Sequence, residues 1–98
     1  MSDPIWQAVR EAADALPEGR RLRLLHRGVR LSVERRGGRL LALRVLPDMP
    51  VPADASPLWQ GRYGQLLRLG GRLMLCCPMP EGMNREALDA LAEATPLV

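Results

Sequence analysis

Residues 29–45 read VRLSVERRGGRLLALRV, and this stretch decides the fold. On both sides of the Gly37-Gly38 pair, apolar residues alternate with arginine or other polar residues. This is the pattern of a β-strand with one buried face. A pair of glycines permits the positive φ angles that a tight connection between strands needs. The stretch therefore predicts a β-hairpin.

The same four residues, Gly-Gly-Arg-Leu, return at positions 70–73 inside a second alternating run, QLLRLGGRLMLCC at 65–77. This run predicts a second hairpin. Residues 21–25 alternate as well and form a candidate further strand ahead of Gly28. Together these patterns predict an antiparallel sheet of four to five strands in two hairpins.

The numbering of the apolar residues sets the expected register, because paired residues on neighbouring strands share a face. In the first hairpin the expected buried residues are odd-numbered: Val29, Leu31, Val33, Leu41, Leu43 and Val45. That set requires a three-residue loop of Gly37 to Arg39, which pairs Val33 with Leu43. The same rule pairs Leu69 with Leu73 in the second hairpin. A two-residue loop would overturn these face assignments.

Short amphipathic helices are predicted at both ends of the chain. Ser2 or Asp3 can cap a first helix that holds Pro4 in its first turn, and Asn84 can cap a last helix that begins at Arg85. The apolar residues expected to face the sheet are Ile5, Val9, Ala12, Ala13 and Leu16 in the first helix, and Ala87, Leu88, Leu91 and Ala92 in the last.

The order of elements completes the fold prediction. Residues 47–57 contain four prolines and should form a loop between the hairpins. Grouped strands flanked by helices indicate one α+β domain over residues 1–98, with the helices on one face of the sheet. No apolar run approaches the roughly 20 residues that span a bilayer. The N-terminus also lacks the pattern of a secretory signal. We therefore expect a cytoplasmic protein without membrane insertion.

Arginine dominates the charge of the chain. Its net charge is +3, and all 14 basic residues are arginine. Between residues 20 and 44 a single acid, Glu34, accompanies nine arginines: Arg20, Arg21, Arg23, Arg27, Arg30, Arg35, Arg36, Arg39 and Arg44. Such a cluster either keeps a sheet face solvated or steers an acidic partner. A nucleic-acid-binding module is an alternative function, although only Trp6, Trp59 and Tyr63 offer aromatic platforms.

The sequence contains no catalytic pattern. His26 is the only histidine and has no acid beside it in the chain, so we expect a hydrogen-bonded surface residue. Cys76 and Cys77 are adjacent in a predicted strand, where they should point to opposite faces and remain reduced thiols. Neither they nor His26 have the spacing of metal ligands. We expect no enzymatic activity, no cofactor and no metal.

The even-numbered face of the predicted sheet carries the candidate interaction residues. The first hairpin and the segment after it supply a partner-binding set of Leu40, Ala42, Arg44, Leu46 and Trp59. The second hairpin supplies a dimer or partner interface of Leu66, Arg68, Met74 and Cys76. This face is too apolar to be left in water, so either a partner protein or a second copy should cover it. Alternatively, Trp59 and the proline-rich loop fold over it.

The order of the elements resembles that of the class I type III secretion chaperones of the Tir chaperone family, in particular the small subunits that act on secretion gatekeepers. The resemblance rests on VRLSVE at 29–34, LLALRV at 40–45 after the glycine pair, and LGGRLML at 69–75. In that family a first helix precedes three strands, a middle helix, two strands and a last helix. The resemblance implies a bacterial cytoplasmic chaperone that binds a secreted effector or gatekeeper protein for export, as a homodimer or a heterodimer with a second chaperone.

Overall fold

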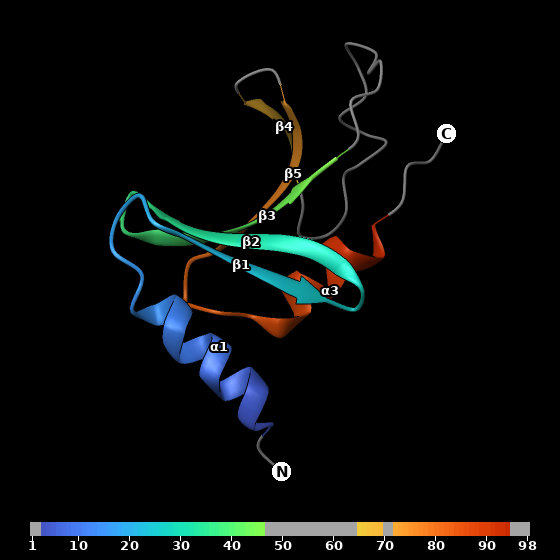
Figure 1. Ribbon diagram of the computed structural model, residues 1–98. Helices are drawn as coiled ribbons and strands as arrows, with labels where there is room; N and C mark the ends of the chain where they lie inside the picture. The colour runs from blue at the N-terminus through green and yellow to red at the C-terminus, as the bar shows by residue number, and fades with distance from the viewer. Residues whose placement is uncertain (1–2, 47–64, 70–71, 95–98) are drawn as a thin grey trace.

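A computed structural model of the protein describes residues 3–46, 65–69 and 72–94. Its elements are helix α1 (Pro4–Asp14), strands β1 (Arg21–His26), β2 (Val29–Arg36), β3 (Arg39–Val45), β4 (Gln65–Leu69) and β5 (Arg72–Met79), and helix α3 (Arg85–Glu93) (Figure 1). The predicted α+β class is confirmed: one helix precedes the strands of an antiparallel sheet in the chain, and another follows them. The predicted loop at 47–57 lies outside the described residues.

The five described strands form one sheet in the order β1-β2-β3-β5-β4, and every neighbouring pair is antiparallel. The candidate strand at residues 21–25 is confirmed as β1. Helices α1 and α3 lie on the same side of the sheet, and β4 curls away from them together with the start of β5 (Figure 1). We call the side that carries the helices the helix face and the opposite side the outer face.

Two-residue turns connect the first three strands. The β1–β2 turn has φ angles of 51° at Arg27 and 76° at Gly28, and the β2–β3 turn has 63° at Gly37 and 77° at Gly38. Positive φ at both central residues is the type I′ geometry, whose twist matches that of the flanking strands. The predicted three-residue loop is therefore wrong.

The shorter loop shifts the register of the first hairpin by one residue. Val33 lies opposite Ala42 and Ser32 opposite Leu43. A shift of one residue exchanges the two faces of a strand. Consequently Leu40, Ala42 and Leu46 lie on the helix face with Leu31 and Val33, while Leu41, Leu43 and Val45 lie on the outer face. The predicted face assignment of β3 is wrong, because apolar residues stand at both odd and even positions of β3 and numbering alone could not decide.

The second hairpin repeats the shift. Leu69 pairs with Arg72 and Leu67 with Met74, so the predicted pairing of Leu69 with Leu73 is wrong. Residues 70 and 71 are outside the described part, yet the pairing of the strands leaves room for only these two between them. The two hairpins thus share one register, as the sequence indicated. In both, the strands are separated by two residues and not by the predicted three.

The core lies between the sheet and the helices. Its largest fully buried side chains are those of Leu75, Met79, Leu88, Val33 and Cys77. Burying each such side chain stabilises the fold by roughly 1.5–3 kcal/mol. Among the described residues, the buried cluster consists of Ala13, Leu31, Val33, Leu40, Ala42, Leu46, Leu73, Leu75, Cys77, Met79, Met83, Ala87, Leu88 and Leu91.

The two helices match their predictions unequally. In α3 the Asn84 side chain accepts a hydrogen bond from the Glu86 N–H at 2.9 Å, and the helix buries Ala87, Leu88 and Leu91 as predicted. In α1 the Asp3 side chain caps the first turn as predicted, but the apolar face is rotated. Trp6, Val9, Ala13 and Leu16 face the core, whereas Ala12 is exposed and Ile5 is 76% exposed. The large Trp6 ring takes the position expected for Ile5.

Two arginines on the helix face hold the C-terminal ends of the helices. Arg44 Nη1 donates to the carbonyl oxygens of Leu91 at 2.7 Å and Ala94 at 2.9 Å. Arg35 Nε donates to the Leu16 carbonyl at 2.6 Å, just beyond the end of α1. The last carbonyls of a helix lack partners within the helix, and a cation there also favours the helix dipole. Arg35 and Arg44 therefore stabilise the fold.

Candidate partner-binding surface

The structure places the predicted partner-binding set in the interior. Leu40, Ala42 and Leu46 are at most 6% exposed within the core, and Arg44 is occupied by α3. A partner could reach these three apolar side chains only by unpacking the helices. Trp59 lies outside the described residues.

The predicted dimer or partner interface divides between the two faces. Met74 and Cys76 lie on the outer face, where both are buried. Leu66 pairs with Leu75, and Arg68 with Leu73, in the ladder between β4 and β5. The side chains of Leu66 and Arg68 are not described. The predicted interface is therefore not one continuous patch of a single sheet face.

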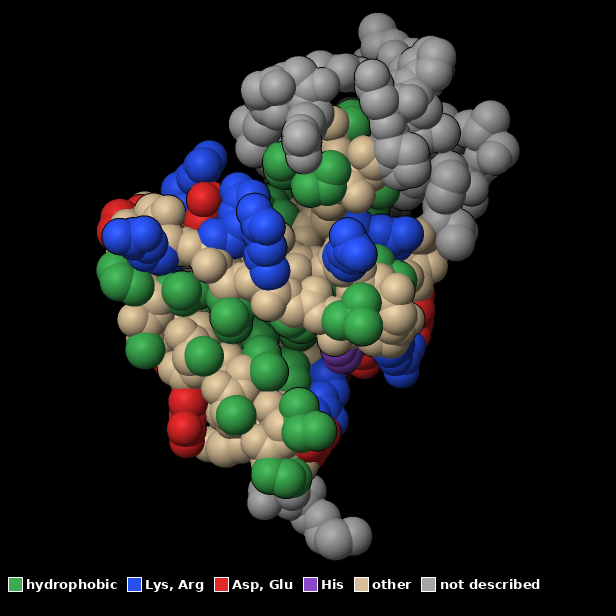
Figure 2. Space-filling view, in the orientation of Figure 1, with side chains coloured by type: hydrophobic (Ala, Val, Ile, Leu, Met, Phe, Trp, Pro, Cys, Tyr) green, Lys and Arg blue, Asp and Glu red, His purple; other side chains and the backbone are tan. Residues whose placement is uncertain are grey.

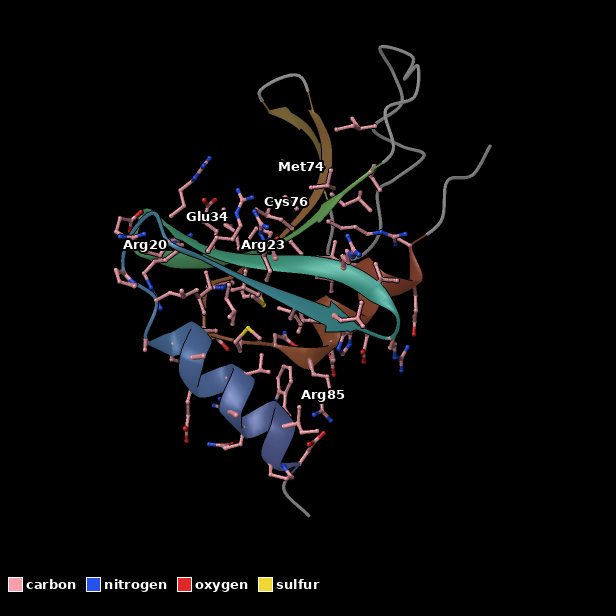
Figure 3. The ribbon with its side chains drawn as sticks, in the orientation of Figure 1. Arg20, Arg23, Glu34, Met74, Cys76 and Arg85 are labelled. Atoms are coloured by element: carbon pink, nitrogen blue, oxygen red, sulfur yellow. The ribbon has the colours of Figure 1, made fainter. Side chains whose placement is uncertain are left out.

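The outer face changes in character from one edge to the other. Along one row of paired residues it runs from exposed Arg23 through half-buried Ser32 to buried Leu43 and Cys76. Figure 3 shows Arg23, Glu34, Cys76 and Met74 on the side of the sheet opposite the helices. In Figure 2 the blue side chains gather over this side of the sheet. The β1–β2 part of the outer face is thus cationic and accessible, and the β3–β5 part is apolar and buried at Leu43, Met74 and Cys76, with Val45 exposed at its border.

A buried carboxylate stands among the arginines of the outer face. Glu34 is 8% exposed, and its oxygens lie 3.7 Å from Arg21 Nη2 and 3.4 Å from Arg36 Nη2. Burial raises the pKa of the nearby Cys76 thiol, Arg36 lowers it and the Glu34 charge raises it further. Among the described residues, neither Arg23 nor Arg30 has an acidic partner. Within the described part of the chain, their guanidinium groups are exposed and can bind an anion.

A groove of about 770 Å³ opens on the cationic part of the outer face. Arg21, Arg23 and Arg30 supply its positive charge, while Leu25 and Val45 supply exposed apolar surface. Leu25 is 70% exposed and Val45 46% exposed. We call this depression the outer groove. It combines three guanidinium groups with two apolar contacts.

A second groove, of about 310 Å³, lies between α1 and β1. We call it the helix groove. Trp6, Val9, Leu24 and Leu25 give it an apolar lining, and exposed Ile5 stands at its mouth. Charged residues also line it: Asp3, Arg27, Arg85 and Asp89. Apolar side chains surrounded by charges are typical of a protein-interaction site.

Arg85 holds the tryptophan of the helix groove in place. Its guanidinium carbon lies 4.5 Å from the centre of the Trp6 ring, and its Nη2 lies 3.3 Å from Asp3 Oδ2. A cation over an aromatic face is attracted by the ring quadrupole. Figure 3 places Arg85 between α1 and the α3 side of the molecule. This contact ties the start of α1 to the start of α3.

Strand β1 borders both grooves and is an edge of the described sheet. It pairs only with β2, and no hydrogen bond joins its other backbone edge to any residue among 3–46, 65–69 and 72–94. Its end is fixed by His26, whose Nε2 lies 2.6 Å from Asp89 Oδ1, and by Arg27, which pairs with Asp89 and Glu93. This edge of β1, unpaired within the described residues, can hydrogen bond with another extended chain.

Sequence reasoning missed parts of this surface. The hydrogen-bonded state predicted for His26 is confirmed, but its acid, Asp89, lies 63 residues further along the chain. The exposure of Leu25 could have been predicted, because Leu25 lies on the same face of its strand as Arg21 and Arg23, where a polar residue is expected. The exposure of Ile5 could not have been predicted, since its position fits an apolar helix face equally well.

The cysteines offer no reactive nucleophile. Both thiols are free and buried; Cys77 lies in the core and Cys76 on the outer face, so the predicted opposite orientation is confirmed. Burial, assisted by the neighbouring Cys76, raises the pKa of the Cys77 thiol to about 11. No three His, Cys, Asp or Glu side chains of the described segments are placed to hold a metal ion.

The comparisons with known proteins add no relative. Neither a protein family nor a curated protein nor a solved structure matched the chain. Among the helices that the structure describes, none is long and apolar enough to cross a membrane.

Proposed function

We propose that the protein is a chaperone of the type III secretion kind, which binds an extended segment of a secreted effector or gatekeeper protein and presents it for export. The observation that carries the proposal is the unpaired edge of β1 with a groove on each side. The described elements follow the family order of a first helix, three strands, two strands and a last helix, and the place of the family's middle helix lies outside the described residues.

A bound segment can add to the edge of β1 as a further strand. An added strand hydrogen bonds along β1, and its successive side chains point alternately to the helix groove and to the outer groove. Backbone bonds give such a complex affinity that depends little on sequence, and the grooves select the side chains. A chaperone that must keep a segment unfolded needs this kind of contact, because the segment stays extended while bound.

The proposal includes a setting and an assembly. It places the protein in the bacterial cytoplasm, with a protein partner, without a cofactor and without a catalytic step. It also includes a dimer, formed with a second copy or with a second chaperone. Exposed Ile5 and partly exposed Trp6 and Val9 on α1 supply apolar surface for a protein contact.

The test is secretion in the bacterium that encodes the chain. Deletion of the gene should reduce export of one type III substrate, and the wild-type gene should restore it. Ile5→Glu puts a charge at the mouth of the helix groove on an exposed position, so it should fold normally and fail to restore export. Ala12→Glu adds the same charge at an exposed position of α1 outside both grooves and should restore export. Unchanged secretion after deletion would refute the proposal.

A basic nucleic-acid-binding module is a second candidate, favoured by the arginines of the outer face that have no acidic partner among the described residues. Salt separates the candidates. A phosphate binder loses affinity steeply as ionic strength rises, because counterions are released on binding. An uncharged, apolar peptide bound along β1 and in the helix groove loses little affinity, because it has no phosphate or carboxylate charges to be screened.

A further inference from the structure

We infer that the outer groove is a binding site for an acidic segment of a partner protein, in which carboxylates occupy alternate positions of an extended chain. This inference rests on the proposed function and names the class of segment that it binds. Its basis is the charge of the groove, the spacing of three guanidinium groups and the kind of side chain that lies between them.

The charge of the groove is only partly neutralised within the protein. Arg21 shares the buried Glu34 carboxylate with Arg36. Arg23 and Arg30 are exposed and have no acidic partner among the described residues. The planar guanidinium group donates two parallel hydrogen bonds to a carboxylate, which makes arginine well suited to this ligand. Among the described residues, the groove therefore has two arginines without an acidic partner and one that shares a carboxylate.

The spacing of the arginines matches that of an extended peptide. Arg21 and Arg23 are two residues apart on one face of β1, a rise of roughly 7 Å. Arg23 pairs with Ser32, and Arg30 lies two residues before Ser32 on β2, so Arg23 and Arg30 are diagonal neighbours at roughly 7–8 Å. Side chains at alternate positions of an extended chain are also roughly 7 Å apart. Carboxylates at every second residue can therefore meet successive arginines.

The apolar residues of the groove favour a peptide over a nucleic acid. Leu25 pairs with Arg30 across β1 and β2, and Val45 lines the same groove from β3. These side chains can pack against the methylene groups of bound glutamate side chains. Proteins that bind single-stranded nucleic acid use aromatic side chains as stacking platforms. No aromatic side chain lines the part of the outer groove that the structure describes.

The test is fluorescence anisotropy with three labelled probes and the full chain. The first probe is a twelve-residue peptide of three Glu-Ser-Glu-Leu repeats, the second has glutamine in place of every glutamate, and the third is a twelve-nucleotide oligothymidine. The wild-type protein should bind the glutamate peptide at least about ten-fold more tightly than the glutamine peptide. Because exposed charge pairs are individually weak, this preference should require several of them.

Two double variants locate the site. Arg23→Gln/Arg30→Gln should weaken binding of the glutamate peptide about ten-fold. Arg10→Gln/Arg39→Gln removes the same charge from two exposed positions that do not line the groove, and should bind within about two-fold of the wild type. Circular dichroism establishes that each variant is folded. Equal weakening in both double variants would overturn the inference, because net charge alone would then explain binding.

The remaining outcomes also decide. Equal binding of the two peptides would overturn the inference, and so would tighter binding of the oligothymidine that Arg23→Gln/Arg30→Gln abolishes, since the groove would then select phosphates. The proposed function is tested by a different experiment, the secretion test, which uses gene deletion and Ile5→Glu in the helix groove. A negative result there refutes the proposed function and does not depend on the peptide-binding result. Ala12→Glu, at an exposed position of α1 that lines neither groove, should leave the affinity for the glutamate peptide unchanged.

Discussion

The helix face and the outer face come from the same strands and contain similar residues, yet they differ in what their arginines do. On the helix face, Arg35 and Arg44 donate to the carbonyls at the ends of the helices. On the outer face, Arg23 and Arg30 are exposed without an acidic partner among the described residues. The difference shows that the face of the strand, and not the local density of charge, decides which arginines are available to a partner.

The largest difference between the faces is expected in the stability lost when each of two neighbouring leucines is truncated to alanine. Leu40 is 2% exposed on the helix face, and Leu41 is half-buried on the outer face. Leu40→Ala leaves a cavity in the core and should lower the free energy of unfolding by roughly 2–5 kcal/mol. Leu41→Ala should lower it by less than half as much. Urea denaturation of both variants measures the two values, and the opposite ranking would support the three-residue loop and refute the observed register.

The adjacent residues Cys76 and Cys77 lie on opposite faces of β5, so the reactivity of their thiols can be compared between the two faces. With a pKa of about 11, Cys77 should react with a disulfide reagent at pH 8 roughly 200-fold more slowly than an unperturbed thiol. Burial also raises the pKa of Cys76, but the Arg36 charge on the outer face opposes this rise, so Cys76 should react faster than Cys77. The single variants Cys76→Ser and Cys77→Ser report each rate separately. Faster labelling of Cys77 would contradict the assignment of faces.

Neutralising one arginine on each face tests the roles of the two kinds of arginine. Arg44→Met keeps the length of the side chain but removes the hydrogen bonds to the end of α3, so it should cost roughly 1.5–3 kcal/mol of stability. Arg30→Met should change stability by less than about 0.5 kcal/mol. Thermal unfolding at one pH gives both values. Equal losses would mean that Arg30 also supports the fold.

The smallest effect is expected at the end of the sheet where α1 leads into β1. The Glu18 carboxylate accepts hydrogen bonds from the backbone N–H groups of Gly37 at 2.6 Å and Gly38 at 2.8 Å. These bonds lower the pKa of Glu18. A lowered folded-state pKa gives stability that is present above the ordinary pKa of glutamate and is lost as the pH falls through roughly 4 and below.

Glu18→Gln should therefore flatten the acid side of the curve of stability against pH and leave the curve nearly parallel to that of the wild type above pH ~6. Urea titrations between acid and neutral pH provide the measurement. Glu11→Gln, at an exposed position of α1, is the control. If Glu18→Gln shows the wild-type slope at acid pH, the carboxylate does not hold the turn in solution.

The sequence predicted the elements better than their pairing. Alternation and glycine pairs located the strands, and Asp3 and Asn84 marked both helix starts, because these signals are local. The register was wrong because Leu40, Leu41, Ala42 and Leu43 are all apolar, so only the geometry of the turn chooses between the faces.

The candidate surface was harder to predict for the same physical reason. The set of Leu40, Ala42 and Leu46 depended on the register and moved into the core with it. The helix groove depends on how α1 is rotated, and this rotation brings Trp6 against Arg85, which is far away in sequence. Long-range contacts of this kind leave no trace in the spacing of residues.

The type I′ turns also have a consequence for the order in which the chain folds. Strands β1, β2 and β3 are joined only by two-residue connections, so their pairing closes very short loops at little cost in chain entropy. Strand β5 instead reaches β3 from a distant part of the chain, as in the pairing of Val45 with Met74. Contacts between near neighbours form fastest in folding. We therefore expect the three-stranded meander to form first and the docking of β5 onto β3 to follow.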